Sequence, residues 1–461
     1  MAPVAAAQSA ISISKKGFVP ADSLFKLVYV PVEVPPGIAE IRVREIYSNQ
    51  GKNVLNLGIY GPEGHRAGTT AGFRGWSGGA KTEFFLNAQE ASTGYVPGKI
   101  TPGLWHVLIY PSTILPTGID WELAVTLVPG ADKQGAFAVS PAPAAVNTKA
   151  GWYRGDLHMH TLHSDGKRTP RELVDEAAAQ GLDFIVSTEH NTNSANLSWG
   201  KYAVPKLLII NGEEVTTTAF GHWNAVGLNP TTLVDWRYTP QDGAVTQCLA
   251  QVHADGGLAI INHPFYNKEL ANGFKFAVKD FDGIEVWNGK WDFLDEPALK
   301  WWDELLRAGT YKLAIAASDT HIAGPSDSRL GIPQTVVKAT GLSRTGIVQG
   351  LKAGRAYLIA EPRISLAFTA RAGSATAEIG ERLFAAAGQT IQLAFSLVNA
   401  PAAVVTLCGD QGVIATENVV SAKPAGLRWT VKAGSTKYLR VEVRTPRGEM
   451  VALTNPIWLG E

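Results

Sequence analysis

The sequence predicts an α/β protein in which a central barrel is flanked by a β-sandwich on each side. The middle of the chain alternates short apolar runs with amphipathic segments, whereas both ends consist of β-rich runs separated by Pro and Gly. A chain of 461 residues also exceeds one ordinary hydrophobic core. We therefore expect an N-terminal β-sandwich with its linker at 1–148, a barrel at 149–362 and a C-terminal β-sandwich at 363–461.

The first part of the chain, residues 10–130, is predicted to be all-β. The runs 40–46, 54–60 and 104–110 are β-rich, and several such runs alternate in hydrophobicity as half-buried strands do. A segment rich in Ala and Pro follows at 140–146 and marks the end of this domain.

The middle part has the β-then-α order of a parallel sheet, which we expect to close into a barrel. A helix should begin after Thr169, which can cap it, with Pro170 in the first turn and Gly181 at its end. Further helices are predicted at 245–254 and 297–308. The predicted strands, all apolar, are 184–187, 207–210, 258–261, 283–287 and 313–317.

The C-terminal part returns to short β runs, such as 390–396 and 438–444, and is predicted to form a second small sandwich.

Composition excludes several classes of protein. The chain is 45% hydrophobic and 18% charged, and its 41 basic residues equal its 41 acidic residues, so no global field would attract nucleic acid. We find no apolar run near ~20 residues, so no membrane span is expected. The two cysteines, Cys248 and Cys408, exclude a disulfide framework and a cysteine-based zinc site.

The alanine-rich start, residues 1–10, leaves the compartment open. Its small residues before Gln8 resemble the end of a secretory signal, but the basic and long apolar parts are absent. A trimmed signal would imply a periplasmic or secreted protein, and a disordered start would imply a cytoplasmic one. The oligomeric state is equally open.

Histidines and carboxylates recur at the ends of the predicted strands. Eight of the ten histidines lie between His158 and His321. His158 and His160 are two residues apart, as are Asp319 and His321, so each pair shares one face of an extended chain. Because functional groups of a parallel barrel gather at the carboxyl ends of its strands, these pairs can converge. Imidazoles and carboxylates gathered in this way are what a multinuclear metal site requires.

The ordered set of motifs resembles the PHP (polymerase and histidinol phosphatase) superfamily over about 150–360. The motifs are HMHTLHSDG from His158, TEH ending at His190, GEE ending at Glu214, HP at His263 and SDTH ending at His321. The resemblance implies a distorted (β/α)7 barrel that holds two or three divalent ions, with zinc, manganese and iron as candidates. The ligands that it implies are His158, His160, Asp165, His190, Glu214, His222, His263, Asp319 and His321.

The flanking segments narrow the resemblance. RGWSGG from Arg74, TGYVPG from Thr93, PGLW from Pro102 and TNPIW from Thr454 are similar to the CehA/McbA branch. That branch is described as metal-dependent hydrolases, including phosphoesterases and enzymes that cleave aryl N-methylcarbamates.

The sequence does not decide whether several residues near these motifs belong to the site. The spacing in the PHP family implies Glu214 as the ligand, and strand alternation would turn Glu213 to the other face. Asn224 shares a face with His222. Glu189 is either an orienting group or a plain strand-end carboxylate, and Glu285 and Asn288 have even odds of facing the pocket. His163 is expected to be a solvated loop histidine and His253 a surface or packing histidine. Ser77 matches GxSxG only in its letters, because the strand–turn–helix setting of a nucleophile is missing.

The function that these motifs favour is hydrolysis of a small phosphoester by a metal-activated hydroxide, preferably of a phosphodiester. Asp165, His222 and His263 are the residues predicted to be catalytic. The alternative is an aryl N-methylcarbamate or carboxylic ester hydrolase. Its aryl group could be bound by aromatic residues near the strand ends, which could equally serve to pack the barrel against its helices: Trp223, Phe265, Tyr266, Trp287 and Trp291. A non-catalytic binding protein and a nucleic-acid enzyme are less favoured readings. The expected partner is thus a small-molecule ester, with no nucleic acid and no membrane.

Overall fold

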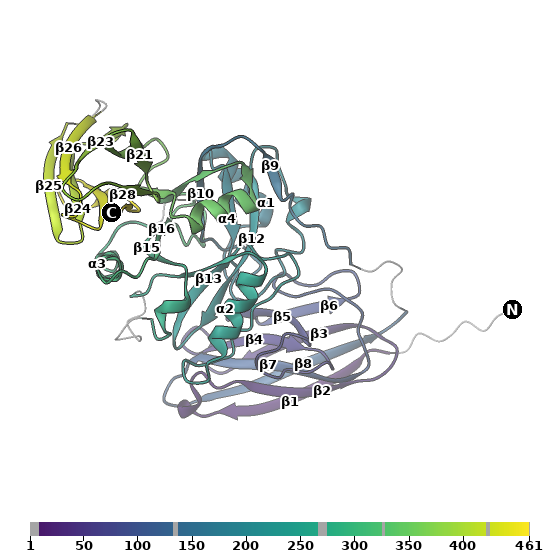
Figure 1. The fold of residues 1–461 in the computed structure, drawn as a ribbon. Helices are drawn as coiled ribbons and strands as arrows, with labels where there is room; N and C mark the ends of the chain where they lie inside the picture. Colours follow the sequence, from purple (N-terminus) through teal and green to yellow (C-terminus); the bar gives the residue numbers. More distant parts are fainter. Residues whose placement is uncertain (1–8, 132–136, 266–273, 325–327, 421–424, 461) are drawn as a thin grey trace.

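The N-terminal part of the chain forms two four-stranded sheets that share one core. The computed structural model (Figure 1) describes residues 9–131, 137–265, 274–324, 328–420 and 425–460, so residues 1–8 of the alanine-rich start lie outside the described residues. The sheet orders are β1-β8-β3-β6 and β2-β7-β4-β5, with all neighbours antiparallel. Apolar residues from both sheets, such as Ile41, Leu57 and Trp105, meet between them. The strands are β1 (Ile11–Val19), β2 (Val28–Val34), β3 (Ile38–Tyr47), β4 (Val54–Tyr60), β5 (Phe73–Gly78), β6 (Glu83–Asn87), β7 (Gly103–Thr113) and β8 (Ile119–Pro129), with a 3-10 turn η1 (Ala21–Ser23).

The central part forms a ring of strands from β10 to β16, in sequence order. The ring closes at the carboxyl ends of its first and last strands, where Met159 forms a parallel bridge with Thr320. At the amino end, β17 pairs with β10 in antiparallel fashion. The strands are β10 (Gly151–Asp156), β11 (Phe184–Ser187), β12 (Leu208–Thr217), β13 (Gly221–Val226), β14 (Leu258–Ile261), β15 (Gly283–Asn288), β16 (Leu313–Ala317), β17 (Gln334–Ala339) and β19 (Ala356–Ile359).

The predicted helices are present, and α1 begins as its sequence indicates. Thr169 and Glu172 form a capping box, each accepting from the backbone of the other, and Pro170 is the first helical residue. The helices are α1 (Pro170–Ala179), α2 (Ala244–Ala254), α3 (Asp295–Arg307) and α4 (Arg344–Lys352), with 3-10 turns η2 (Trp199–Lys201) and η3 (Val278–Asp280). No helix of the described chain combines the length and apolar character needed to cross a bilayer.

The ring departs from a regular alternation of parallel strands and helices. The parallel order predicted for the middle of the chain is wrong at β13, which pairs antiparallel to both β12 and β14. The cause is a tight turn at 218–220, which reverses the chain too soon for a helical crossover. In the described chain, the links from β11 to β12 and from β14 to β15 contain only η2 and η3.

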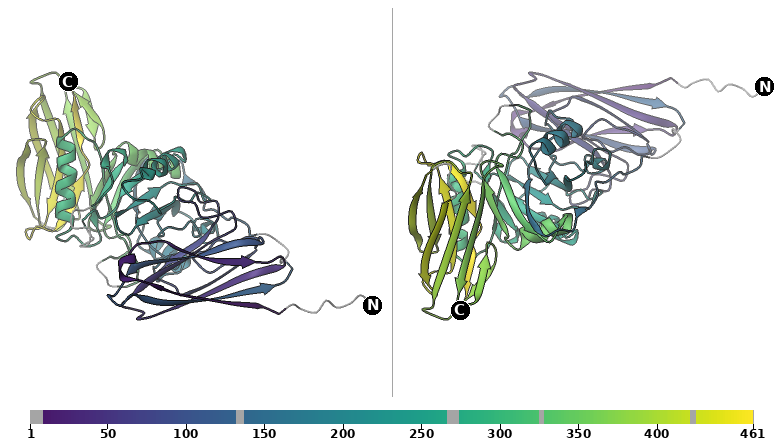
Figure 2. Two further views of the ribbon diagram at one scale, coloured as in Figure 1. Left: turned by 90° about the horizontal axis from the view of Figure 1, so that it is seen from below. Right: turned by 90° about the horizontal axis from the view of Figure 1, so that it is seen from above.

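The C-terminal part forms a sandwich whose second sheet continues the barrel sheet. β28 pairs with β19, so the order β17-β19-β28-β27-β24-β25 crosses the expected boundary at 362. The facing sheet is β21-β20-β23-β26, and α3 lies beside the C-terminal strands (Figure 2). The strands are β20 (Ser365–Ala372), β21 (Ala375–Glu378), β22 (Arg382–Phe384), β23 (Thr390–Val398), β24 (Ala403–Gly409), β25 (Gly412–Val419), β26 (Ala425–Lys432), β27 (Tyr438–Arg444), β28 (Met450–Thr454) and β29 (Ile457–Gly460).

The linker between the first two parts is tied to the barrel. Its β9 (Ala145–Asn147) pairs with β18 (Leu342–Ser343), and the backbone of Ser140 bonds to Leu197 and Gly200. Cys248 and Cys408 are buried free thiols.

Candidate metal centre

The candidate site lies at the carboxyl ends of the ring strands. His158 and His160 follow β10, His190 follows β11, and Asp319 follows β16. The closure of the ring sets their spacing, because the amide of Asp319 donates to the carbonyl of His158 at 2.9 Å. The amide of His160 in turn donates to Thr320 at 3.0 Å.

A buried carboxylate below the site, Asp156, fixes this closure. It accepts the amides of His158 at 3.3 Å, Ser318 at 3.0 Å and Gly331 at 2.7 Å. It therefore joins the segment that carries His158 to the segment that carries Asp319. Its role was not predicted, because sequence shows no sign that a strand residue reaches two distant loops.

Glu214 is the centre of the site. One carboxylate oxygen, Oε2, lies 3.3 Å from His158 Nε2, 3.5 Å from His160 Nε2 and 2.8 Å from His190 Nδ1. The other, Oε1, lies 3.1 Å from His222 Nδ1 and 3.3 Å from His263 Nε2. A carboxylate that faces two groups of imidazoles in this way is placed to bridge two ions.

Asp319 approaches the same histidines from the opposite strand. Its Oδ1 is 3.1 Å from His160 Nε2 and 3.3 Å from His158 Nε2, and its Oδ2 is 3.9 Å from His263 Nε2. Asp319 has φ +50° and His263 has φ +23°, both in the left-handed region that residues other than glycine seldom adopt. Such backbone strain is retained where the surrounding structure imposes it, and it concentrates at functional sites.

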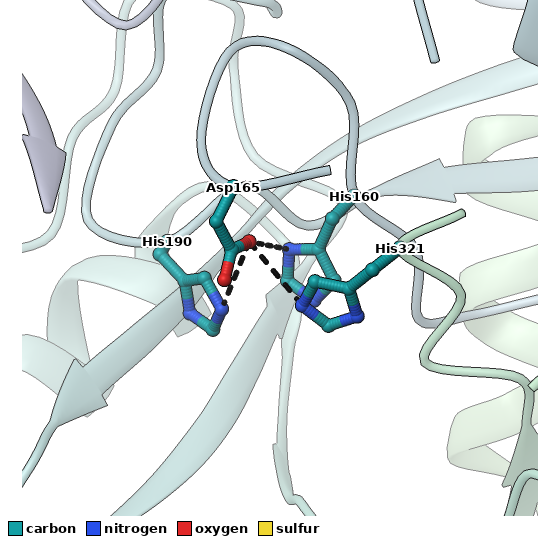
Figure 3. A group of neighbouring side chains, drawn as sticks. All are labelled: His160, Asp165, His190 and His321. Carbon is teal, nitrogen blue, oxygen red and sulfur yellow. Dashed lines mark ion pairs between the residues drawn. The ribbon is translucent and has the colours of Figure 1, made fainter. Parts of the chain in front are cut away.

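The outer side of the site is built around Asp165, on the loop after β10. Its Oδ1 lies 3.2 Å from His321 Nε2, 3.6 Å from His190 Nε2 and 4.0 Å from His160 Nδ1, and Figure 3 shows the three rings turned toward this carboxylate. Because the side chain of Asp165 is 44% exposed, this side of the site is open to solvent.

Further polar groups orient the imidazoles. Glu285 Oε1 lies 3.0 Å from His158 Nδ1, so the Nε2 of that ring faces Glu214, and Glu285 Oε2 accepts the amide of His263. A carboxylate behind a histidine is a common partner of metal-binding imidazoles. Asn262 donates to Glu214 Oε1 at 2.9 Å.

The close contacts between carboxylates and imidazoles shift the pKa values of both kinds of group. Burial would raise the pKa of Glu214, but His190 and His158 outweigh it and hold that pKa well below its usual range. Burial would lower the pKa of His190, yet Glu214 and Asp165 raise it to about 9. Burial and the nearby His321 and His190 lower the pKa of His160 to about 3.

The residues present fit divalent cations. The atoms His158 Nε2, Asp165 Oδ1 and Glu214 Oε2 are buried and lack a hydrogen-bond partner within the described chain. Buried polar atoms seldom remain unpaired, and all three belong to groups whose donor atoms lie within 4.8 Å of one another. The groups that could hold an ion are His160–Asp165–His190–His321, His158–His160–Glu214, His190–Glu214–His222 and His158–His263–Glu285.

The structure brings together all the residues predicted as ligands, together with Glu285, which the sequence left open as a pocket residue. That they bind ions stays a prediction. Glu213 points away, as strand alternation requires, and its carboxylate accepts the amide of Val234. Asn224 is buried and donates its side-chain amide to the carbonyl of Leu157.

Two predictions about neighbouring residues change. His163 is buried and lies 2.8 Å from Ser194 Oγ, so the expectation of a solvated histidine is wrong. Glu189 is buried and accepts from Thr161 and Ser164 in the loop that carries Asp165. This contact supports the interpretation of Glu189 as an orienting group.

The structure gives a non-catalytic contact for each of three further residues whose role the sequence did not decide. Ser77 is buried and lies 2.9 Å from the Tyr95 hydroxyl, so it is no exposed nucleophile. His253 pairs with Asp282 at the surface, as expected. Asn288 does face the site and donates to Glu285.

The aromatic residues proposed for an aryl group mostly pack elsewhere. Trp223 donates to the Tyr238 hydroxyl, and Trp287 packs edge-on against Trp291. Phe265 packs edge-on against Trp301, and Tyr266 lies outside the described residues.

Two cavities adjoin the site. One of about 440 Å³ lies between the N-terminal sandwich and the barrel and is lined by Asp165, His190 and His222. The other, of about 330 Å³, is lined by His263, Asp319 and His321. The contribution of the N-terminal sandwich was not predicted, since nothing in the sequence relates its strands to the barrel loops.

The N-terminal sandwich also holds the loop of Asp165. Lys81 Nζ, beyond the end of β5, donates to the carbonyls of Leu162 at 2.7 Å and Ser164 at 3.3 Å.

Comparison with known proteins gives distant likenesses. No family model matches the chain. An uncharacterized protein of Methanocaldococcus jannaschii is 26% identical over 147 residues, covering 29% of this chain and 81% of that protein. A two-domain protein from Bacteroides vulgatus, described as containing a predicted PHP-like metal-dependent phosphoesterase, is 20% identical, with a TM-score of 0.39 over 71% of this chain and all of that one.

An amidohydrolase from Chromobacterium violaceum, solved with bound sulfate, is 19% identical, with a TM-score of 0.27 over 38% of this chain and 93% of its own. These values are too low to establish a family or a shared fold. The function is therefore inferred below from the site itself.

Proposed function

We propose that this protein is a metal-dependent hydrolase of the PHP type that cleaves a small phosphoester, preferably a phosphodiester. The observation that carries the proposal is the pair of carboxylates, Glu214 and Asp319, each within 4 Å of several imidazoles. Three buried ligand atoms of the site, His158 Nε2, Asp165 Oδ1 and Glu214 Oε2, make no hydrogen bond in the described chain and have only oppositely charged side chains beside them. Such a donor set suits zinc, manganese or iron better than calcium or magnesium.

The inner residues would hold the ions. His158, His160 and Asp319 converge with Glu214 in the buried interior, and His222 and His263 face its second oxygen. When bound, divalent ions lower the pKa of water toward ~7 and stabilise the negative charge that develops on a phosphoryl or carbonyl oxygen. No serine or cysteine nucleophile is then required.

The outer residues would meet the substrate. Asp165 and His222 both line the interdomain cavity, and the His222 side chain is 23% exposed. We assign His222 to a further substrate oxygen or to the leaving group, and Asp165 to orientation of the groups at the mouth. His263, beside both Glu214 and Asp319, completes the predicted catalytic set.

The test measures bound metal and turnover in the same preparations. Purified protein is loaded with manganese or zinc, dialysed and analysed for metal content. Hydrolysis of bis-p-nitrophenyl phosphate, p-nitrophenyl phosphate and 1-naphthyl N-methylcarbamate is then followed with and without chelator. We expect more than one ion per chain and chelator-sensitive cleavage of the diester.

Two variants make the test specific. Asp319→Ala should lose metal, and its turnover should fall by at least about 1000-fold, since metal-ion catalysis supplies several kcal/mol. Asp175→Ala changes an exposed carboxylate on α1 and should match the parent. Metal-free protein with full activity would overturn the proposal, and carbamate cleavage with silent phosphates would favour the carbamate hydrolases of the CehA/McbA branch.

A further inference from the structure

The two cavities beside the site differ in charge. The cavity on the far side is lined by Glu285, Asp292 and Asp319, with Lys290 as its basic residue. The interdomain cavity has Asp165 as its carboxylate and Lys167 as its basic residue, beside His190 and His222. An anionic ligand is therefore better accommodated on the interdomain side.

The wall that the N-terminal sandwich contributes to this cavity is uncharged. It consists of residues from β4, β5, the turn after β5, and β7, with Asn56, Ser77 and Ser112 as polar members. Asn56 donates to the carbonyl of Tyr110, which fixes its amide against the wall. Gly78 and Gly79 add no side chain to the wall. At Gly79 there is no room for one, because a Cβ would lie 2.5 Å from the side chain of Val54.

The two lysines near the mouth have different roles. The ammonium of Lys81 donates hydrogen bonds to the carbonyls of Leu162 and Ser164. Lys167 is exposed, and its ammonium has no hydrogen-bond or ion-pair partner among the residues that the structure describes. Its backbone is fixed, however, because its amide donates to the carbonyl of His321 at 2.7 Å. An anchored cation with a free ammonium is placed to bind an anion at the mouth.

We propose that the interdomain cavity is the substrate pocket, in which Lys167 binds the anionic group of the ester and the sandwich wall receives the leaving group. This inference rests on the proposed function and adds a substrate class to it. The ester carries its negative charge on the phosphoryl group beside the predicted metal ligands, and the alcohol part that faces the sandwich wall carries no charged substituent. A cavity of about 440 Å³ limits the substrate to a small molecule.

The first experiment measures binding and does not depend on turnover. Methyl phosphate is titrated into manganese-loaded parent, Lys167→Met and Lys290→Met proteins in a calorimeter, after their metal contents have been matched. Lys167→Met should weaken binding by about fivefold to tenfold, as expected for one partly exposed charge-assisted contact. Lys290→Met, on the far cavity, should bind as the parent does, and Lys167→Arg should recover most of the loss.

The second experiment probes the wall with two neighbouring residues of β7. Ser112 lines the pocket, whereas Thr113 is exposed on the other face of the strand. Ser112→Trp should raise KM for bis-p-nitrophenyl phosphate by about tenfold and change KM for the smaller methyl p-nitrophenyl phosphate much less. Thr113→Trp should change neither, and thermal unfolding of both variants establishes that the sandwich is folded.

The outcomes separate this inference from the proposed function. Lys167-dependent phosphate binding in a protein that hydrolyses no ester would retain the pocket and overturn the hydrolase. Hydrolysis with phosphate binding that depends on Lys290, or on neither lysine, would retain the hydrolase and overturn the pocket. Equal effects of Ser112→Trp and Thr113→Trp on both esters would likewise contradict the assignment of the wall.

Discussion

The two β-sandwiches of this chain flank the same barrel but meet it in different ways. The N-terminal sandwich lies against the carboxyl ends of the ring strands, where Lys81 holds the loop of Asp165 and Thr192 donates to the carbonyl of Gly94. The C-terminal sandwich is joined to the barrel through the pairing of β19 with β28, and none of its described residues lines either cavity beside the site. One therefore borders the site, and the other extends the scaffold.

The chemistry of the two interfaces agrees with this division. At the C-terminal interface, Arg440 of β27 pairs with Asp303 of α3 at 2.7 Å and lies over the ring of Trp302. The Tyr438 hydroxyl donates to the same carboxylate. The charged groups of this network pair with one another. At the N-terminal interface, by contrast, a cavity stays open and Lys167 is exposed. The same type of domain thus serves as a support in one place and as a pocket wall in the other.

The largest effect on turnover should come from a change to the barrel itself, at Glu214, which belongs to neither sandwich. Glu214→Gln removes the charge shared by two groups of imidazoles, so turnover should fall by at least about 1000-fold with loss of bound metal. Both sandwiches should stay folded, as measured by circular dichroism and thermal unfolding. Retained metal and activity would contradict the proposal that Glu214 holds the ions.

Removal of the buried arginine at the C-terminal interface should affect stability and leave substrate binding unchanged. Arg440→Met leaves Asp303 without its main partner, and loss of one partner of a buried pair costs about 3 kcal/mol. Urea unfolding measures this loss, while KM of the folded variant should equal that of the parent. Exposed Arg371→Met, on β20, is the matched control. A large KM change in Arg440→Met would remove the distinction between the two sandwiches.

The N-terminal sandwich holds a buried carboxylate, Glu45, with neither oxygen hydrogen-bonded in the described chain. Burial raises its pKa well above the usual range. Below about pH 4.3 the folded and unfolded states are both protonated at this group. Above that pH the unfolded state releases its proton first, so stability falls with rising pH until the folded-state pKa is reached.

Glu45→Gln should therefore stabilise the protein by about 2 kcal/mol at pH 7, since it removes the cost of a buried carboxyl that ionises on unfolding. The gain should shrink toward pH 4. Thermal unfolding between pH 4 and 8 measures it, with the exposed Glu33→Gln of β2 as control. A gain that is independent of pH would refute this account of Glu45.

The smallest effect should come from the clamp between the N-terminal sandwich and the loop of Asp165. Lys81→Met removes two hydrogen bonds to that loop. Loss of an outer orienting contact lowers metal affinity by about tenfold or more. Chelator competition measures the affinity, Lys81→Arg should restore part of it, and Lys52→Met in an exposed turn is the control. Unchanged affinity would mean that the sandwich borders the site without shaping it.

Much of the site could be predicted from sequence because its residues follow local rules. His158 and His160, or Asp319 and His321, fall at strand ends with a spacing of two, and this pattern survives folding because strand alternation is local. The helix at α1 was equally predictable, since Thr169, Glu172 and Pro170 form its start without help from distant parts.

The residues that sequence reasoning missed depend on contacts between distant segments. Asp156 joins the loops after β10 and β16, and Lys81 and Ser112 come from another domain. The antiparallel direction of β13 was not predicted, because an apolar strand can be followed either by a hairpin or by a helical crossover, and its own sequence does not distinguish the two.

The sequence by itself thus determined which side chains are candidate ligands and at which strand ends they lie. The tertiary structure alone decided that Glu214 lies between two groups of imidazoles, that β13 runs antiparallel, and that only one sandwich borders the site. The physical reason is that ligand chemistry and strand periodicity belong to single segments, whereas cavities and interfaces arise from packing between segments far apart in the chain.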